Sequence, residues 1–202
     1  MKRVLAFFGA FNPPTVAHVE LARFAMERTG REGVVFVPSK SVYIRGEQGK
    51  DFAFGEGERL EMLRRIADTR PWMAVTDIEF RAESQPRTYD SLCRLRDEGY
   101  SPALLMGSDK LAELERVWMH VEDIGREFGF VCMTRGADEC ARLLREDPYL
   151  AAVARYITVV ETPASLRGVS STAVRQRLSR IRELRDEIAD LVPEEILAML
   201  ES

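Results

Sequence analysis

The sequence predicts an α/β fold in which helices cover both faces of a parallel β-sheet. Short apolar segments alternate along the chain with segments whose apolar residues recur at helical spacing. Two of the short segments, residues 4–8 and 33–38, are apolar throughout, which is typical of strands buried on both faces. The chain has 202 residues, and no repeat or change of composition divides it. We therefore expect a single domain over residues 1–202, with a C-terminal helical part over about 170–202.

The segment after the first expected strand combines a turn with the start of a helix. Gly9 permits a tight turn in which the backbone approaches a ligand. The Asn-Pro-Pro sequence at 12–14 keeps the chain extended, Thr15 is a suitable N-cap, and His18 falls in the first helical turn. A helix N-terminus facing a glycine turn predicts an anion site within reach of His18. The alternative is an ordinary strand–turn–helix with a surface histidine.

The next elements follow from apolar spacing. The first helix is expected over 15–29 and ends near Gly30, and the second strand covers 33–38. The polar loop at 39–57 has basic residues that either meet phosphates or lie in solvent: Lys40, Arg45 and Lys50. The helix at 58–68 has four residues on its expected inner face: Leu60, Leu63, Ile66 and Ala67.

The middle of the chain continues the alternation. Residues 73–80 alternate between apolar and polar, which predicts a strand with one solvated face. The helix at 88–99 begins at a threonine N-cap and ends at a glycine. An apolar strand at 103–106 leads into a Gly-Ser-Asp turn at 107–109, and residues 111–123 are expected to be mostly helical.

The last third supplies two further strands. They are expected at 128–133 and 156–160, with a helix at 137–145 between them. Three hydroxyl residues at 170–172 cap a long charged helix, and Pro193 starts a final short helix at its first turn.

The expected topology groups three loops. In open parallel sheets, ligands bind beyond the carboxyl ends of the strands, where the strand order reverses. We therefore expect the loops at 9–18, 107–109 and 163–175 to lie close together.

The composition of the chain limits the kinds of partner that it can bind. The formal net charge of −4 argues against non-specific nucleic-acid binding. Cys93, Cys132 and Cys140 form no Cys-x-x-Cys pair, and two histidines are too few for a histidine-built metal site. The charged start is followed by too short an apolar run for a signal peptide, and no stretch is long enough to span a membrane. We expect a cytoplasmic protein that binds neither nucleic acid nor a membrane.

A second candidate anion site lies at residues 168–175. Ser170, Ser171 and Thr172 stand at a helix start, and Arg175 follows on its first turn. Hydroxyls, helix N–H groups and a guanidinium together hold phosphate oxygens. The alternative is a capping serine with a surface arginine. Two such helix starts in one chain suit a triphosphate.

Both segments resemble signatures of the nucleotidyltransferase superfamily. Residues 9–18 follow its Gly-x-Phe-x-Pro-x-(His/Thr)-x-Gly-His pattern, except that Ala17 replaces a glycine and would narrow the approach of a nucleotide. Residues 169–175 are similar to its Ile-Ser-Ser-Thr-x-x-Arg motif, with valine for isoleucine. The resemblance implies a Rossmann-like nucleotidyltransferase fold. It also implies this ATP-binding set: Gly9, Ala10, Phe11, Thr15, His18, Gly107, Asp109, Ser170, Ser171, Thr172 and Arg175.

The middle of the chain resembles the nicotinate (nicotinamide) mononucleotide adenylyltransferases. The Gly-Ser-Asp turn is followed by Trp118 nine residues after Asp109, and the Thr88 segment is similar to their Thr-x-Asp-Thr-Leu. The resemblance implies that Trp118 stacks on the pyridine ring, Asp109 binds ribose hydroxyls and Thr88 lies near the nicotinate end, with Lys40 and Arg135 completing the mononucleotide-binding set. Ordinary alternatives are a core tryptophan and a capping aspartate. The family's Pro-Pro-His-Lys is absent from the 39–57 loop.

The implied activity is adenylyl transfer from ATP to nicotinic acid mononucleotide, giving deamido-NAD and pyrophosphate in NAD biosynthesis. His18, as a cation, and Arg175 would be the catalytic residues. The cofactor Mg²⁺ would be held by phosphates and water, with no ligand from the protein. Alternatives are the same chemistry on nicotinamide mononucleotide or phosphopantetheine, and a non-catalytic nucleotide-binding protein. The sequence does not decide between the acid and the amide form of the mononucleotide, and it leaves open whether the protein forms a homo-oligomer.

Overall fold

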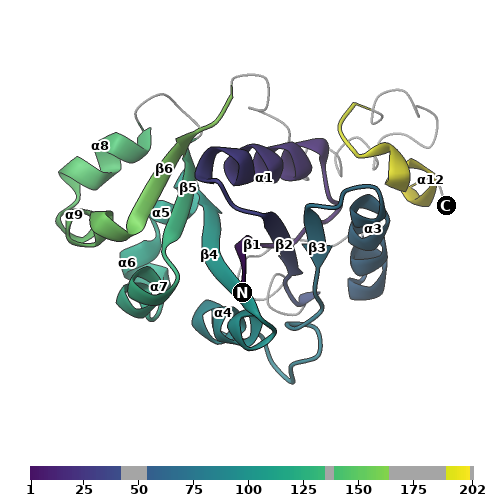
Figure 1. The fold of residues 1–202 in the computed structure, drawn as a ribbon, viewed down its shortest axis with the longest axis horizontal. Coiled ribbons are helices and arrows are strands. Elements are labelled where there is room, and N and C mark those ends of the chain that lie inside the picture. The colour runs from purple at the N-terminus through teal and green to yellow at the C-terminus, as the bar shows by residue number, and fades with distance from the viewer. Residues whose placement is uncertain (42–53, 135–138, 164–189, 201–202) are drawn as a thin grey trace. The chain divides into compact units, whose positions relative to one another are not determined.

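The computed structural model describes residues 1–41, 54–134, 139–163 and 190–200 (Figure 1). Six strands form one sheet in the order β3-β2-β1-β4-β5-β6, and the expected α/β fold with a parallel sheet and packed helices is confirmed. The strands are β1 (Lys2–Gly9), β2 (Gly33–Pro38), β3 (Met73–Val75), β4 (Tyr100–Gly107), β5 (Phe130–Thr134) and β6 (Ile157–Glu161). The strand order reverses between β1 and β4, which is the kind of position where such sheets bind ligands.

The chain divides into two compact units, each assembled from separate segments. The first unit comprises Met1–Phe7, Leu21–Val34 and Pro86–Arg167. The second unit comprises Phe8–Glu20, Val35–Gln85 and Gly168–Ser202. The expectation of a single domain over 1–202 stays a prediction.

The first unit is built on parallel strands. Phe7 of β1 lies opposite Leu105 of β4, Leu104 of β4 opposite Phe130 of β5, and Phe130 opposite Ile157 of β6. β4 and β5 carry a buried apolar core, as their sequences predict, whereas in β6 only Val160 is buried. In Figure 1, α8 and α9 lie side by side next to this sheet. The helices of the unit are α4 (Thr88–Asp97), α5 (Ser108–Leu111), α6 (Leu114–Val117), α7 (Val121–Glu127), α8 (Glu139–Glu146), α9 (Pro148–Val153) and the short η1 (Ala154–Tyr156).

In the second unit, α3 (Glu56–Asp68) packs against β3. The helix α1 (Val16–Thr29) begins in this unit, and its first N–H donates to the carbonyl of Leu191 at 2.9 Å. The C-terminal elements η3 (Glu194–Ile196) and α12 (Leu197–Leu200) follow, and η3 lies against α3 (Figure 1). The start of α1 is therefore braced by the C-terminal segment.

The expected strand at 73–80 is wrong in length. The strand β3 ends at Val75, and the chain then turns over residues 78–82. Glu79 is buried there and accepts a hydrogen bond from the Gln85 amide at 2.6 Å. The apolar–polar alternation continues past Val75, but these tertiary contacts set the backbone instead.

Two helix starts differ from the expectation. The helix α3 begins at Glu56, and its fully buried residues are Arg59, Met62, Leu63 and Ile66, whereas Leu60 and Ala67 are only half-buried. The N-cap of α4 is Arg87, so Thr88 is the first helical residue and not the cap. Leu63 and Ile66 are therefore buried as predicted, whereas the other two inner residues of α3 and the N-cap of α4 were predicted wrongly.

The segment 111–123, expected to be mostly helical, is helical in three separate pieces. Residues 108–127 form α5, α6 and α7, with Trp118 extended and His120 in the left-handed region at φ 60°. Pro193 is the N-cap of η3 rather than its first residue, and α9 was not predicted. The expected helix starting at 170 lies outside the described residues. Within the described ranges, no helix has the length and apolar character needed to cross a bilayer.

Candidate functional site

The turn after β1 is shaped by Phe11. The Phe11 side chain is 1% exposed, and its backbone has φ 44°, in the left-handed region. A Cβ added to Gly9 would meet the Phe11 ring at 3.0–3.3 Å. A side chain at position 9 would press on the Phe11 ring, which folds back over the glycine, and this gives the Gly-x-Phe spacing a physical reason. Phe11 also packs against Phe36 of β2, with ring centroids 5.3 Å apart.

Thr15 fixes the orientation of the His18 ring. The Thr15 backbone N–H donates to His18 Nδ1 at 3.0 Å, and the Thr15 hydroxyl lies 2.8 Å from the same atom. The Thr15 Oγ1 also accepts the His18 backbone N–H at 3.3 Å, so Thr15 is the expected N-cap. Phe11 meets the His18 ring edge-on at 5.2 Å. The imidazole is thus held on two sides.

This geometry fixes the tautomer of His18. Nδ1 accepts from a backbone N–H, so Nδ1 carries no proton and Nε2 does. In this arrangement Nε2–H is the hydrogen-bond donor that the ring offers. The expectation of a cationic His18 concerns the ring beside bound phosphates and stays a prediction.

Arg59 of α3 connects the turn to the end of β2. Its guanidinium donates to the carbonyl of Ala10, to the carbonyl of Ser39 at 3.0 Å and to the hydroxyl of Ser41 at 3.0 Å. It also lies over the Phe80 ring, 5.2 Å from the centroid. One side chain thus fixes the backbone of the turn and of the segment that follows β2.

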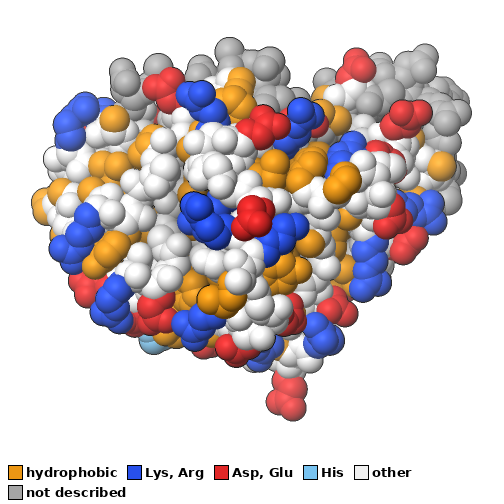
Figure 2. Space-filling model, viewed as in Figure 1, with side chains coloured by type: hydrophobic (Ala, Val, Ile, Leu, Met, Phe, Trp, Pro, Cys, Tyr) orange, Lys and Arg blue, Asp and Glu red, His pale blue; other side chains and the backbone are white. Residues whose placement is uncertain are grey.

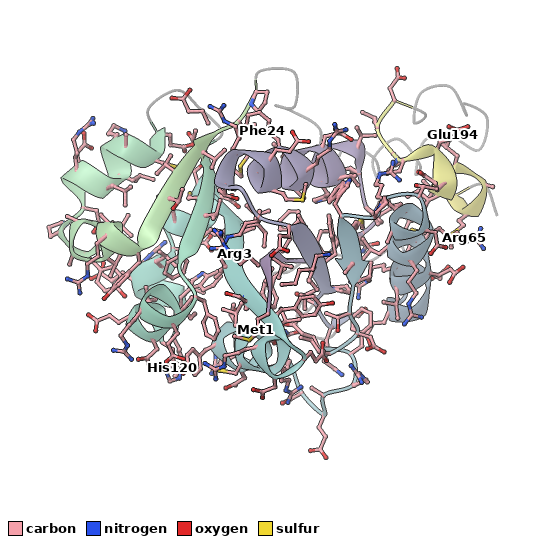
Figure 3. All side chains as sticks on the ribbon, in the orientation of Figure 1. Met1, Arg3, Phe24, Arg65, His120 and Glu194 are labelled. Atoms are coloured by element: carbon pink, nitrogen blue, oxygen red, sulfur yellow. The ribbon has the colours of Figure 1, made fainter. Side chains whose placement is uncertain are left out.

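Arg59 is an unusual arginine. It is 0% exposed, and burial lowers its pKa to about 10, although the nearby Glu56 carboxylate works against this shift. Arg65 of the same helix lies on its outer side (Figure 3), pairs with Glu61 and stays half-exposed. The sequence motifs do not include Arg59. The available signal was its position three and four residues before Met62 and Leu63, on the apolar face of α3.

Lys40, expected to meet the mononucleotide, makes structural contacts. Its ammonium donates to the carbonyls of Phe80 at 2.9 Å and Ala82 at 2.6 Å, and its backbone N–H donates to Gln85. These bonds fasten the end of β2 to the turn at 78–82. Its role toward a phosphate stays a prediction.

The turn after β4 is built differently. Asp109 is exposed in the first turn of α5, and a Cβ on Gly107 would lie 2.6 Å from its Oδ1. The carboxylate therefore folds back over the glycine. Ser108 is 1% exposed and donates to Glu139 of α8 at 2.7 Å. The Ser108–Glu139 bond ties this turn to the first residue of α8.

The two remaining candidates of the first unit lie on its helices. Thr88, the first residue of α4, is half-buried. Trp118 is half-buried between two exposed apolar neighbours, Val117 at 57% and Met119 at 52%. The alternative of a fully buried core tryptophan is therefore excluded.

The structure brings together Gly9, Ala10, Phe11, Thr15 and His18 in the second unit, and Gly107 and Asp109 in the first. The other expected site residues lie outside the described residues: Arg45, Lys50, Arg135, Ser170, Ser171, Thr172 and Arg175. No group of three or more His, Cys, Asp or Glu suited to a metal occurs in the ranges that the structure covers. Basic and acidic side chains are intermixed on the face in Figure 2.

Comparison with known proteins gives one family. The model of the cytidylyltransferase-like family matches residues 6–177. A probable nicotinate-nucleotide adenylyltransferase of Carboxydothermus hydrogenoformans is 30% identical over 85% of this chain and 84% of its own length. A protein of the same description from Caldicellulosiruptor bescii is 25% identical over 96% of this chain and 95% of its own length.

Solved structures share the fold. Nicotinic acid mononucleotide adenylyltransferase of Plasmodium falciparum, complexed with NaAD, has a TM-score of 0.72 and 17% identity, covering 98% of this chain and 96% of its own. A putative nicotinate-nucleotide adenylyltransferase from Vibrio parahaemolyticus has a TM-score of 0.64 and 16% identity, with all of both chains covered.

Proposed function

Because the chain belongs to the cytidylyltransferase-like family, and within it to the nicotinate-nucleotide adenylyltransferases, we propose that it transfers the adenylyl group of ATP to nicotinic acid mononucleotide. The products are deamido-NAD and pyrophosphate. The observation that carries the proposal is the turn at 9–18, where Thr15 orients His18 so that Nε2–H is a hydrogen-bond donor at a helix N-terminus.

The reaction needs no nucleophile from the protein. A 5′-phosphate oxygen of the mononucleotide attacks the α-phosphorus of ATP, the bond to the bridging oxygen breaks, and pyrophosphate leaves. The protein must hold two polyanions in line, and positioning of this kind contributes roughly 7–11 kcal/mol. Charge that develops on the phosphoryl oxygens needs fixed donors.

His18 and the start of α1 are the donors that we assign to this charge. The uncharged ring donates a hydrogen bond from Nε2–H to a phosphoryl oxygen, and the N–H groups of the first turn of α1 donate further hydrogen bonds. A neutral donor keeps its proton throughout the transfer, so no proton step couples to it. Arg175 and the hydroxyls at 170–172 stay proposed partners of the phosphates.

The Gly107 turn and Trp118 are assigned to the nucleosides. The exposed Asp109 carboxylate accepts hydrogen bonds from ribose hydroxyls, and the partly open Trp118 ring offers an aromatic face to the pyridine. Thr88 is assigned to the nicotinate end. These assignments stay proposals, as do the roles of Lys40 and Arg135.

The residues of the turn at 9–18 suit Mg²⁺ only when the ion is bound to the phosphates of ATP. The turn at 9–18 offers N–H donors and an imidazole that donates, which bind anions rather than a cation. When bound, Mg²⁺ would neutralise charge on the triphosphate.

Ala17 does not argue against nucleotide binding. The residue is 3% exposed, so its methyl group lies against protein rather than at the surface. The substitution of the family's glycine therefore leaves the proposed donors in place.

The test is pyrophosphate release with ATP and Mg²⁺, run in parallel with nicotinic acid mononucleotide, nicotinamide mononucleotide and phosphopantetheine. We expect the highest kcat/KM with nicotinic acid mononucleotide. A higher value with either other acceptor overturns the substrate assignment. ATP binding without turnover on any acceptor favours a non-catalytic nucleotide-binding protein.

A further inference from the structure

Two of the three cysteines form a pair that the proposed reaction does not use. Cys132 lies in β5 and Cys140 is the second residue of α8, and their sulfur atoms are 3.3 Å apart. Both side chains are 0% exposed. Cys93 of α4 is half-buried and is the third thiol. The pair therefore differs from Cys93 in having a second sulfur in contact.

We propose that Cys132 and Cys140 are a redox-modification site that closes to an intramolecular disulfide when a peroxide oxidises it. A disulfide has sulfur atoms about 2.05 Å apart, so closure requires a relative movement of about 1.2 Å. That movement is within the adjustment of one short helix. The pair spans eight positions of sequence, and only the first turn of α8 has to follow.

The two thiols have different environments. The pKa of Cys140 is lowered, because hydrogen bonds with Cys132 and Thr134 outweigh the opposing effect of burial. The pKa of Cys132 is raised by its hydrogen bond with Cys140 and by burial. We write the step with Cys140 as the attacking thiolate and Cys132 as the resolving thiol, and the reverse order gives the same disulfide.

The electrons and atoms balance with one peroxide. The Cys140 thiolate attacks a peroxide oxygen, the O–O bond breaks, hydroxide leaves and Cys140 becomes a sulfenic acid. The Cys132 sulfur then attacks the Cys140 sulfur, the S–O bond breaks, and the Cys132 proton leaves with the hydroxide as water. Two thiols and one hydrogen peroxide give one disulfide and two waters.

The pair is adjacent to the turn after β4. Glu139, the neighbour of Cys140, accepts the hydrogen bond of Ser108 at 2.7 Å, and Ser108 precedes Asp109. Closure of the disulfide pulls the first turn of α8 toward β5 and moves the Glu139 carboxylate with it. This second step rests on the proposed function, because it makes the affinity of the Gly107 turn for a nucleoside depend on the oxidation state.

The thiol count tests the disulfide directly. The purified full chain is treated with hydrogen peroxide, alkylated with iodoacetamide, and its intact mass is measured over time. We expect two of three thiols to be lost with a mass decrease of two hydrogens, and dithiothreitol to restore them. Both thiols are buried, so the reaction proceeds through local opening and is slower than alkylation of Cys93.

Matched variants identify the pair. Cys93→Ala is expected to close the disulfide as the wild type does, whereas Cys132→Ala and Cys140→Ala lose the two-hydrogen decrease. A higher melting temperature of the oxidised protein is expected from the cross-link. Any of three results overturns the proposal: three thiols remain after oxidation, one thiol gains two or three oxygens, or Cys93→Ala fails to form the disulfide.

The functional step has its own readout. Pyrophosphate release is measured on oxidised and reduced protein, with Ser108→Ala as the uncoupled control. We expect oxidation to raise KM several-fold in the wild type and to leave KM of the variant at its reduced value. Equal KM in both states of the wild type overturns the coupling while the disulfide stands. No turnover in the reduced protein counts against the proposed function and leaves the thiol result intact.

Discussion

The turn after β1 and the turn after β4 both join a buried strand to a helix through a glycine, but they are held in different ways. In the first, Phe11 and Thr15 are buried, and Arg59 fastens the backbone from α3. In the second, Asp109 is exposed at the start of a four-residue helix. The first turn is therefore a fixed element and the second is an adjustable one.

The comparison indicates a division of work. A donor for developing charge must be in place before the reaction, because its reorganisation would add to the barrier. A group that recognises ribose can take up its position after the ligand has bound. The buried turn suits the first task and the exposed carboxylate suits the second. Four changes test this division, beginning with the largest expected effect.

Replacement of His18 tests the fixed turn most directly. His18→Ala removes the Nε2 donor, and we expect kcat to fall by roughly 10²–10³-fold, as on loss of one preorganised donor. His120, the other histidine of the chain, is exposed at the start of α7 (Figure 3), so His120→Ala serves as the matched control. Steady-state pyrophosphate release measures both. His18→Gln, which keeps a neutral donor, should retain more kcat than His18→Ala. Equal kcat in wild type and His18→Ala would falsify the role of His18.

Removal of the Arg59 guanidinium tests whether the first turn is held from α3. Arg59→Met leaves the Ala10 and Ser39 carbonyls without this donor, so we expect a loss of about 3 kcal/mol in the free energy of unfolding. Arg65→Met removes an exposed arginine of the same helix and should cost less than about 1 kcal/mol. Urea unfolding of both variants gives the difference. Similar losses would mean that Arg59 is no stronger an anchor than a surface arginine.

The same contrast explains what the sequence could and could not predict. The strand at 33–38 has the predicted bounds, because an uninterrupted apolar run bounded by glycine and proline has one satisfactory environment. The expected strand at 73–80 is too long, because Glu79, Gln85 and Lys40 bond across the chain where the alternation continues. Local pattern decides the first case, and tertiary contacts decide the second.

The candidate site shows the same limit. Thr15 and His18 were found because a cap and a helix register fix their relation within four residues. Arg59 was missed because its acceptors lie 18 to 49 residues away, a distance on which no local rule acts. Lys40 was singled out by charge alone, and charge does not reveal that carbonyls of residues 80 and 82 accept from it.

Replacement of Gly107 tests whether the turn after β4 depends on the position of the Asp109 carboxylate. Gly107→Ala places a methyl group 2.6 Å from Asp109 Oδ1, so the carboxylate must move. We expect kcat/KM to fall about tenfold, since a hydrogen bond to a charged group contributes roughly 1.5–3 kcal/mol and part of it is regained by adjustment. The unfolding free energy should change little.

Gly57 is the matched control for this change. It lies in α3 with nothing within 4 Å of an added Cβ, so Gly57→Ala should stabilise the helix by about 0.5–1 kcal/mol and leave kcat/KM unchanged. If Gly107→Ala loses no more activity than Gly57→Ala, then kcat/KM does not depend on the position of the Asp109 carboxylate.

The smallest expected effect concerns the C-terminal segment that braces α1. Burial raises the pKa of Glu195, but hydrogen bonds from Arg70 and Thr69 outweigh it, so its pKa lies below the usual 4.5. A lowered carboxyl pKa stabilises the folded state above about pH 4.5, and this contribution is lost as the pH falls through the folded-state pKa. Glu195 and Arg70 are both partly exposed, so we expect Glu195→Gln to cost at most about 1 kcal/mol at pH 7 and progressively less as the pH falls below 4.5. The exposed Glu194→Gln is the control, and urea unfolding between pH 3 and 7 measures both. If the two variants lose equal stability at every pH, the Leu191 carbonyl holds the start of α1 without help from this ion pair.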